Sequence, residues 1–218
     1  MKTLFRPVVI VVALVMTITT GLLVRHTEQG YVQYIEGNLA EAKSLLSERG
    51  RQGDALASFV AAGLAGQWVR NPLDVCKSRQ LYALSAEQGF PAARALYVAT
   101  LLQLSSSPDS CAWVEESLDM LTGSDNGLAA VMMSILLEQK ACGGPAPQQS
   151  LIYLLLGRSQ GMKAMGDKID ALAALPGTSV EAAETEARIL LEQIRPPVDW
   201  PAIHASEPPG FCQGVIPD

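Results

Sequence analysis

A short phrase recurs along this 218-residue chain at a nearly constant spacing, and it limits the folds that the chain can adopt. An amide residue followed by glycine occurs at Gln52-Gly53, Gln88-Gly89, Asn126-Gly127 and Gln160-Gly161, and these glycines are 36, 38 and 34 residues apart. This is the period of a helix–turn–helix repeat. One such unit is too small to bury its own apolar face, so successive units must stack. The spacing therefore predicts an all-α fold, a short solenoid of about four repeats.

The helix boundaries follow from local signals within this period. A half repeat with a helix over 38–48 comes first, where Asn38 is the expected N-cap. Pro72 and Ser179 mark helix starts, because proline is tolerated in the first turn and a serine side chain can cap it. Glycine between units lets the chain reverse through a positive φ. The predicted helix pairs are 54–65 with 73–87, 91–104 with 110–121, 128–140 with 148–159, and 162–175 with 180–194.

The N-terminal segment predicts export from the cytoplasm. Lys2 and Arg6 precede an uncharged run over 7–24, which Arg25 ends. As a helix these residues would span roughly 27 Å, close to the hydrocarbon thickness of a bilayer. We favour an uncleaved anchor in a bacterial inner membrane over a cleaved signal, which usually has a shorter apolar core and a small-residue exit. Basic residues before the run stay cytoplasmic, so in both cases the rest of the chain faces the periplasm, either anchored or soluble.

The predicted organisation has four parts: an anchor or signal segment over 1–25, a connector over 26–37, the repeats over 38–194, and a tail over 195–218. The tail holds six of the 13 prolines, so we expect it to be extended rather than helical. It also carries the large apolar residues Trp200, Ile203 and Phe211, which a purely disordered tail would usually lack. We expect it to pack back over the last helices as a cap; the alternative is a contact with a partner.

Four cysteines fit an oxidising compartment: Cys76, Cys111, Cys142 and Cys212. They permit three pairings into two disulfides. Cys76 and Cys111 occupy nearly equivalent sites in adjacent units, whereas Cys142 lies in a loop from which Cys111 or Cys212 is within reach. We favour Cys76–Cys111 with Cys142–Cys212, the second of which would tie down the tail.

The unit that ends at Gly89 carries a more specific pattern. It contains Asp74, Lys77 and Leu81-Tyr82, then the turn 85–89 with sequence SAEQG, and then Pro91-Ala92-Ala93. This resembles the Sel-one-like repeat family, a branch of the tetratricopeptide-like solenoids, over about residues 38–194. Ser78, Leu81 and Ser85 depart from the family pattern, and the other units are more divergent. The resemblance implies a right-handed α/α solenoid with a scaffold or adaptor role, often in bacterial envelope assemblies.

Several classes of chemistry find no support in the sequence. A net charge of −6 gives no clustered basic face for nucleic acid. No nucleophile elbow, zinc-binding helix motif or phosphate loop occurs, and the only histidines are His26 and His204. Glu115-Glu116 is interpreted as a solvated helix face, and Met132-Met133 as core rather than an adaptable binding surface. We therefore expect no catalytic, metal or cofactor site and no small-molecule ligand.

The resulting functional hypothesis is a membrane-tethered periplasmic scaffold that binds a protein of the cell envelope. The recognition surface is expected on the face lined by the first helices, where Arg94 and Gln103 are candidates for contact. A permanent structural subunit of a multiprotein membrane machine is the alternative. An enzyme, for example a hydrolase of cell-wall material, is disfavoured.

Overall fold

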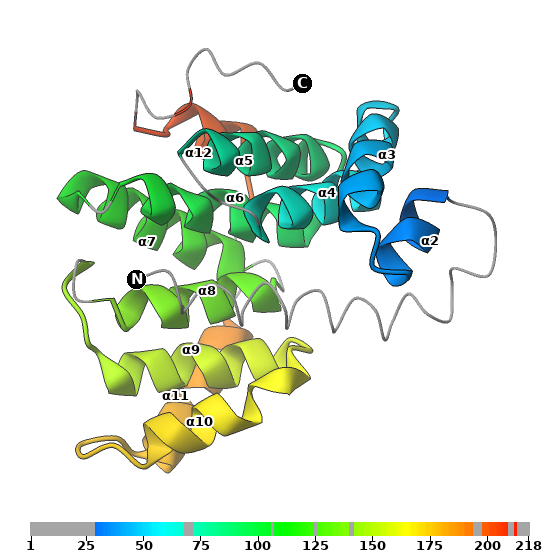
Figure 1. Ribbon diagram of the computed structural model, residues 1–218. Coiled ribbons are helices and arrows are strands. Elements are labelled where there is room, and N and C mark those ends of the chain that lie inside the picture. Colours follow the sequence, from blue (N-terminus) through cyan, green and yellow to red (C-terminus); the bar gives the residue numbers. More distant parts are fainter. Residues whose placement is uncertain are drawn as a thin grey trace. The chain divides into compact units, whose positions relative to one another are not determined.

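The computed structural model describes residues 29–67, 72–105, 107–123, 126–139, 142–193, 198–208 and 212. All regular structure in these residues is helical, and most of the helices pack against their neighbours in the chain (Figure 1). The all-α prediction is confirmed, and packing in sequential pairs is consistent with a repeat solenoid. The chain divides into two compact units: unit 1 holds Met1–Ala93 and Phe211–Asp218, and unit 2 holds Arg94–Gly210.

The predicted membrane segment 7–24 lies outside the described residues. Of the helices that the structure does describe, none combines the length and the apolar character needed to cross a membrane.

Unit 1 is a succession of four helices, each packed against the next. They are α2 (Gln29–Ile35), α3 (Leu39–Arg51), α4 (Ala55–Gln67) and α5 (Pro72–Glu87). Helix α5 begins at the predicted proline. The ring of Phe59 on α4 lies 4.8 Å from that of Phe90 and 5.6 Å from that of Tyr82, so aromatic side chains fill the space between helices.

Two features at the start of unit 1 were not visible in the sequence. Residues 29–35 of the predicted connector form α2, which packs on α3 because Gly30 permits close approach. A Cβ at Gly30 would lie only 3.0 Å from the Leu46 side chain. Asn38 is the N-cap residue of α3, as predicted, but its side chain makes no capping bond, because its amide donates instead to Gln33 Oε1 at 2.6 Å.

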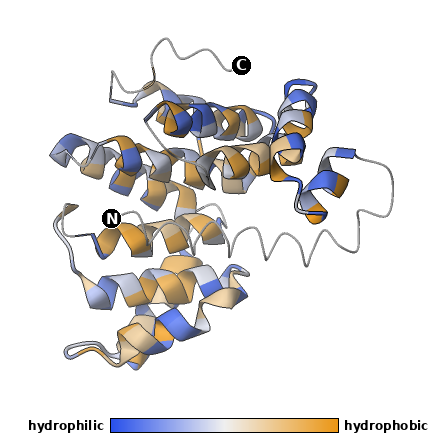
Figure 2. Cartoon of the chain, viewed as in Figure 1, coloured by the Kyte–Doolittle hydropathy of each residue, from blue (hydrophilic) through white to orange (hydrophobic). Residues whose placement is uncertain are grey.

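Helix α6 (Pro91–Leu104) begins in unit 1 and continues into unit 2, and its bounds are those predicted. Unit 2 then contains α7 (Pro108–Thr122), α8 (Gly127–Leu137), α9 (Pro147–Ser159), the 3₁₀ turn η2 (Lys163–Met165), α10 (Gly166–Ala173), α11 (Val180–Glu192) and α12 (Trp200–Ala205). Helix α8 packs against both α7 and α9. It is hydrophobic along most of its length, whereas α3 is mostly hydrophilic (Figure 2).

Two further predictions in unit 2 need correction. The single helix expected over 162–175 is broken, because Ala164 has φ −80° and ψ 22°, and α10 begins only at Gly166. The tail is not extended over 200–205, where α12 forms. Asp199 Oδ1 accepts a bond from Ala202 N at 3.0 Å, and Pro201 occupies the first turn, where its missing N–H costs nothing.

Candidate interaction surface

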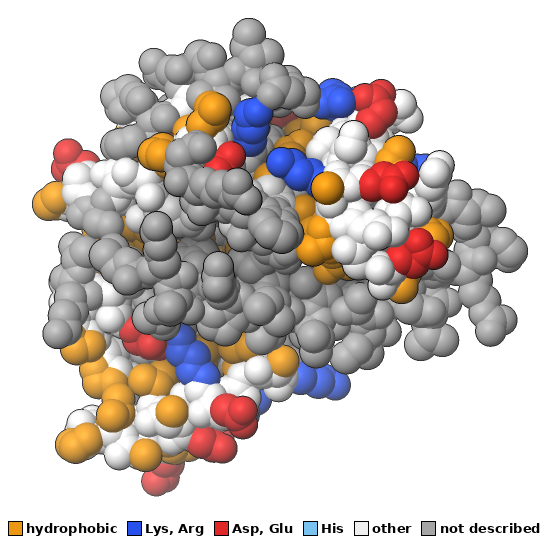
Figure 3. Space-filling view, viewed as in Figure 1, with side chains coloured by type: hydrophobic (Ala, Val, Ile, Leu, Met, Phe, Trp, Pro, Cys, Tyr) orange, Lys and Arg blue, Asp and Glu red, His pale blue; other side chains and the backbone are white. Residues whose placement is uncertain are grey.

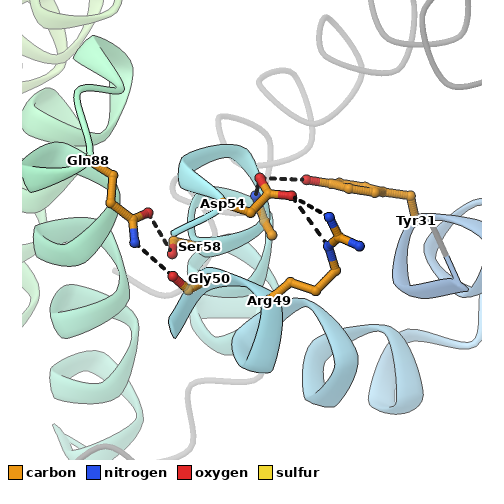
Figure 4. A network of polar contacts seen from close by, with 7 residues as sticks. Tyr31, Arg49, Gly50, Asp54, Ser58 and Gln88 are labelled. Atoms are coloured by element: carbon orange, nitrogen blue, oxygen red, sulfur yellow. Dashed lines mark hydrogen bonds and ion pairs between the residues drawn. The ribbon is translucent and has the colours of Figure 1, made fainter. Parts of the chain in front are cut away.

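The repeated amide–glycine phrase makes a specific contact between successive repeats. Gln88, at the end of α5, donates from Nε2 to the backbone oxygen of Gly50 in α3 at 2.7 Å (Figure 4). Its Oε1 accepts a bond from Ser58 Oγ of α4 at 3.3 Å. One amide side chain thus joins α5 to the two preceding helices, and a half-buried bond of this kind stabilises a fold by about 1 kcal/mol.

The same contacts recur in unit 2. Gln160 Nε2 donates to Thr122 O at 3.0 Å, and both Gln bonds span 38 residues. Three bonds of unit 1 have counterparts exactly two repeats, or 72 residues, later in the chain. The bond from Gln88 to Gly50 corresponds to that from Gln160 to Thr122. The bond from Ser78 Oγ to Ala62 O corresponds to that from Ser150 Oγ to Ser134 O. The cap of Ala57 N by Asp54 Oδ1 corresponds to the cap of Ala129 N by Asn126 Oδ1.

The turn glycines divide into two kinds. Gly53, Gly89 and Gly161 have φ of 102°, 91° and 100°, which favours glycine because it has no Cβ. Gly127 is different, since it is the first residue of α8 rather than a turn residue. A Cβ there would lie 3.1 Å from Gln160 O and 2.9 Å from Met162 Cγ, so Gly127 serves close packing instead.

A polar network joins the first three helices of unit 1 (Figure 4). Asp54 caps α4 through its bond from Ala57 N, and its other carboxylate oxygen accepts from Arg49 Nη2 at 3.3 Å. Tyr31 of α2 donates its hydroxyl to Asp54 Oδ1 at 3.4 Å. The carboxylate therefore fixes α2, α3 and α4 to one another at their ends.

Two of the first helices of the repeats, α4 and α8, offer little surface to a partner. Every residue of α8 from Gly127 to Ser134 is buried, including Met132 and Met133, and the described side chains of α4 are buried or half-buried. Of the two residues proposed for contact, Gln103 is exposed. Arg94 is half-buried, with its guanidinium 5.9 Å from the centre of the Trp200 ring of α12.

Helix α11 is the most open of the long helices in unit 2. Only Ala183 and Ala187 are fully buried, and the helix packs on α9. Its exposed residues combine acidic and large apolar side chains. We name the acidic and large apolar ones the α11 face: Val180, Glu181, Glu184, Glu186, Ile189, Leu191 and Glu192, of which the three apolar side chains are 39%, 46% and 44% exposed. Ala182, Thr185 and Arg188 are exposed beside them.

Three side-chain contacts hold α11 in place. Ser179 Oγ caps it by accepting from Ala182 N at 3.2 Å, as predicted. Gln148 of α9 binds the Ser179 backbone twice, donating to its carbonyl oxygen and accepting from its N–H at 2.8 Å. Arg158 of α9 lies 3.5 Å from the Glu184 carboxylate. The α11 face is therefore presented on a fixed helix.

The negative charge of the chain is concentrated in unit 2. Residues 94–210 hold 14 of the 22 acidic residues and 7 of the 16 basic ones, a net charge of −7, which leaves +1 for unit 1. On the side seen in Figure 3, acidic side chains lie near hydrophobic ones in the part of unit 2 where Figure 1 draws α10, whereas α11 is mostly hidden behind α9 and α10. A clustered charge of one sign attracts partners of the other sign.

Two disulfides form, and their pairing differs from the one we favoured. Cys76 pairs with Cys212 and Cys111 with Cys142, each with Cα atoms 5.4 Å apart. The prediction of Cys76–Cys111 with Cys142–Cys212 is therefore wrong. The sequence left Cys111 and Cys212 as the two partners within reach of Cys142, and Cys142 pairs with Cys111. Two disulfides in one chain are typical of an oxidising compartment outside the cytoplasm.

The tail helix α12 packs on α6 and α7 of unit 2. Trp200 and Ile203 are buried, and the Tyr97 ring of α6 lies edge-on to Trp200 at 5.3 Å. Tyr97 also hydrogen-bonds Glu207, and Trp113 Nε1 of α7 donates to Ser206 Oγ at 3.1 Å. His204 stacks on Trp200 with a ring separation of 6.0 Å, so it belongs to this aromatic cluster.

One chain of groups superficially resembles a catalytic arrangement. Ser150 Oγ donates to Glu138 Oε1 at 2.8 Å, and Lys168 Nζ lies 2.9 Å from the same oxygen. Ser150 is completely buried, and its hydroxyl also contacts Ser134. A substrate could not reach it, so these groups tie α8, α9 and α10 together. Across the described ranges, no three His, Cys, Asp or Glu residues are grouped so as to hold a metal ion.

Sequence reasoning missed the α11 face. Nothing in the local sequence marks Val180, Ile189 and Leu191 as exposed, because large apolar residues in a helix are usually buried. The only available signal was position, because the last helix of a stack has no following helix to cover it. Comparison of the chain with known protein families, with curated proteins and with solved structures finds no match.

Proposed function

We propose that this protein is an exported, membrane-tethered scaffold of the bacterial envelope, built as a degenerate Sel-one-like solenoid, and that it binds a partner protein through the α11 face. The observation that carries the proposal is an open helix at the end of the repeats with exposed apolar and acidic side chains. Terminal repeats normally carry a polar outer face. Large exposed apolar side chains rimmed by charge mark protein interaction sites.

The partner surface follows from the chemistry of the α11 face. Val180 and Leu191, three turns apart on one side of α11, would contact an apolar patch, and the glutamates beside them would attract lysine or arginine around it. The partner is therefore a protein with a basic, partly apolar segment. The two disulfides support a location outside the cytoplasm, and the segment 7–24 is the proposed tether.

The test is co-purification from detergent-solubilised membranes of cells that express the full chain. The double variant Ile189→Ser/Leu191→Ser should lose a co-purifying protein that the parent chain retains. Leu73→Ser on α5 is the matched control, since Leu73 is 47% exposed but belongs to unit 1, whereas α11 belongs to unit 2. Equal recovery with all three chains would contradict a role for the α11 face. Recovery that does not depend on residues 38–194 would overturn the scaffold function itself.

The same exposed apolar side chains also favour the second hypothesis, a permanent structural subunit. Size-exclusion chromatography of the purified chain separates the two. A scaffold that binds reversibly should elute as a stable species on its own. A permanent subunit should aggregate, and Ile189→Ser/Leu191→Ser should then restore solubility.

A further inference from the structure

Helix α2 exposes apolar side chains on the side that faces away from unit 1. Ile35 is 64% exposed, the highest value for any large hydrophobic side chain among the described residues, and Val32 is 41% exposed. They are three residues apart, so they lie on the same face of the helix. The opposite face carries Gly30 and Tyr31, which are buried.

The orientation of α2 is set by its contacts with unit 1. Gly30 lies so close to α3 that a Cβ would meet Leu46 at 3.0 Å. Tyr31 donates to Asp54, the N-cap of α4. Because these contacts fix one side of α2, Val32 and Ile35 are held outward.

The length of chain before α2 limits where the helix can lie. The uncharged run ends at Val24 and α2 begins at Gln29. Five residues reach at most about 18 Å when fully extended. The headgroup layer on each side of the hydrocarbon core is about 5–8 Å thick. If residues 7–24 span a bilayer, α2 therefore starts in or just outside the headgroup layer.

We propose that α2 lies against the outer surface of the membrane that residues 7–24 cross, with Val32 and Ile35 entering the boundary between lipid headgroups and acyl chains. This inference rests on the tether in the proposed function. Amphipathic helices bind at this depth through their apolar side chains. The α2 sequence has no lysine or arginine, so the contact is apolar rather than electrostatic. Docking of α2 would hold unit 1 in one orientation to the lipid surface.

The experiment is photo-crosslinking of the full chain in vesicles of phosphatidylethanolamine and phosphatidylglycerol. The photoreactive residue p-benzoylphenylalanine replaces Ile35, or Val32 in a second variant, and Leu73 in the control. We expect phospholipid adducts, identified by mass, several-fold more often at positions 35 and 32 than at position 73. High salt should leave the yield unchanged, because charge does not drive the contact.

Adducts at positions 32 and 35 with another protein, a second copy or residues 1–28 would overturn the inference, as would a yield equal to that of position 73. Alkaline extraction of the same membranes separates this failure from failure of the tether. A chain that stays in the membrane without lipid adducts contradicts only the α2 contact. A chain that is released contradicts both the tether and the α2 contact.

Discussion

The side-chain amide of Gln88 donates to the backbone oxygen of Gly50, 38 residues earlier in the chain and 2.7 Å away. Gln160 and Thr122 repeat this relationship over the same separation. At Gln88-Gly89 and Gln160-Gly161 the phrase thus has two functions: the glycine reverses the chain, and the amide binds the repeat before it. The third Gln of this kind, Gln52, instead donates to Glu48 on its own helix. No full repeat precedes Gln52 within the described residues.

Removal of the amide should destabilise the fold only where it spans repeats. Gln88→Ala and Gln160→Ala should each lower the free energy of unfolding by about 1–2 kcal/mol, because a half-buried carbonyl loses its donor. Gln52→Ala should cost less than about 0.5 kcal/mol, since its bond is exposed. Urea denaturation with both disulfides intact measures these differences. Equal effects at all three positions would contradict the inter-repeat role.

Gly50 is a second test of the same junction. A Cβ at Gly50 would lie 2.2 Å from Ser58 Oγ and 3.0 Å from Ser58 Cα, so α3 and α4 would have to separate. Gly50→Ala should therefore destabilise the protein by about 1–3 kcal/mol. Gly63 lies inside α4, and a Cβ there would come no closer than 3.8 Å to another residue, the Tyr82 hydroxyl. Gly63→Ala should therefore stabilise the protein by about 0.5–1 kcal/mol. Thermal unfolding followed by circular dichroism compares the two.

Trp200 should matter for its ring and not for its N–H group. The ring is buried against Tyr97, whereas Nε1 has no hydrogen-bond partner in the described part of the chain. Trp200→Ala should cost about 3–5 kcal/mol, and Trp200→Phe less than about 1.5 kcal/mol. Chemical denaturation followed by far-ultraviolet circular dichroism measures both. A loss for Trp200→Phe as large as that for Trp200→Ala would contradict this prediction, because a phenylalanine ring would then not replace the packing of Trp200.

The disulfides should be found as Cys76–Cys212 and Cys111–Cys142 in peptide mapping without reduction. They close sequence separations of 136 and 31 residues, for which loop entropy gives about 5 and about 4 kcal/mol of stabilisation. Replacing both cysteines of one pair by alanine should lower stability by up to these amounts. A Cys76–Cys111 peptide would contradict the structure.

Stability should fall at alkaline pH because of Tyr82. Burial raises the pKa of its phenol above the ordinary value of about 10. As the pH rises, the unfolded chain loses this proton before the folded protein does. The stabilisation that the protonated Tyr82 gives to the folded state is therefore complete below pH 10 and is lost as the pH rises above 10. The slope is at most about 1.4 kcal/mol per pH unit. Tyr82→Phe should flatten the decline in unfolding free energy between pH 9 and 11, and an unchanged slope would exclude Tyr82 as its source.

Local chemistry explains why most helices were predictable. Pro72 and Pro91 begin their helices and Ser179 caps α11, because these signals act within a single turn. The predictions failed where partners distant in sequence decided the outcome. Gly127 was set by close packing against Gln160 and Met162 rather than by a turn, and Cys76 pairs with Cys212 across 136 residues.

The amino-acid pattern is enough to predict the helical period, the turn glycines at 53, 89 and 161, and the presence of disulfides. The pairing of the cysteines, the folding of the tail into α12, and the exposure of Ile35 and the α11 face beside a buried α8 become visible only in the folded chain. The reason is that capping and periodicity are local. Pairing and burial depend on which surfaces the stacked helices bring together, and that is a property of the whole fold.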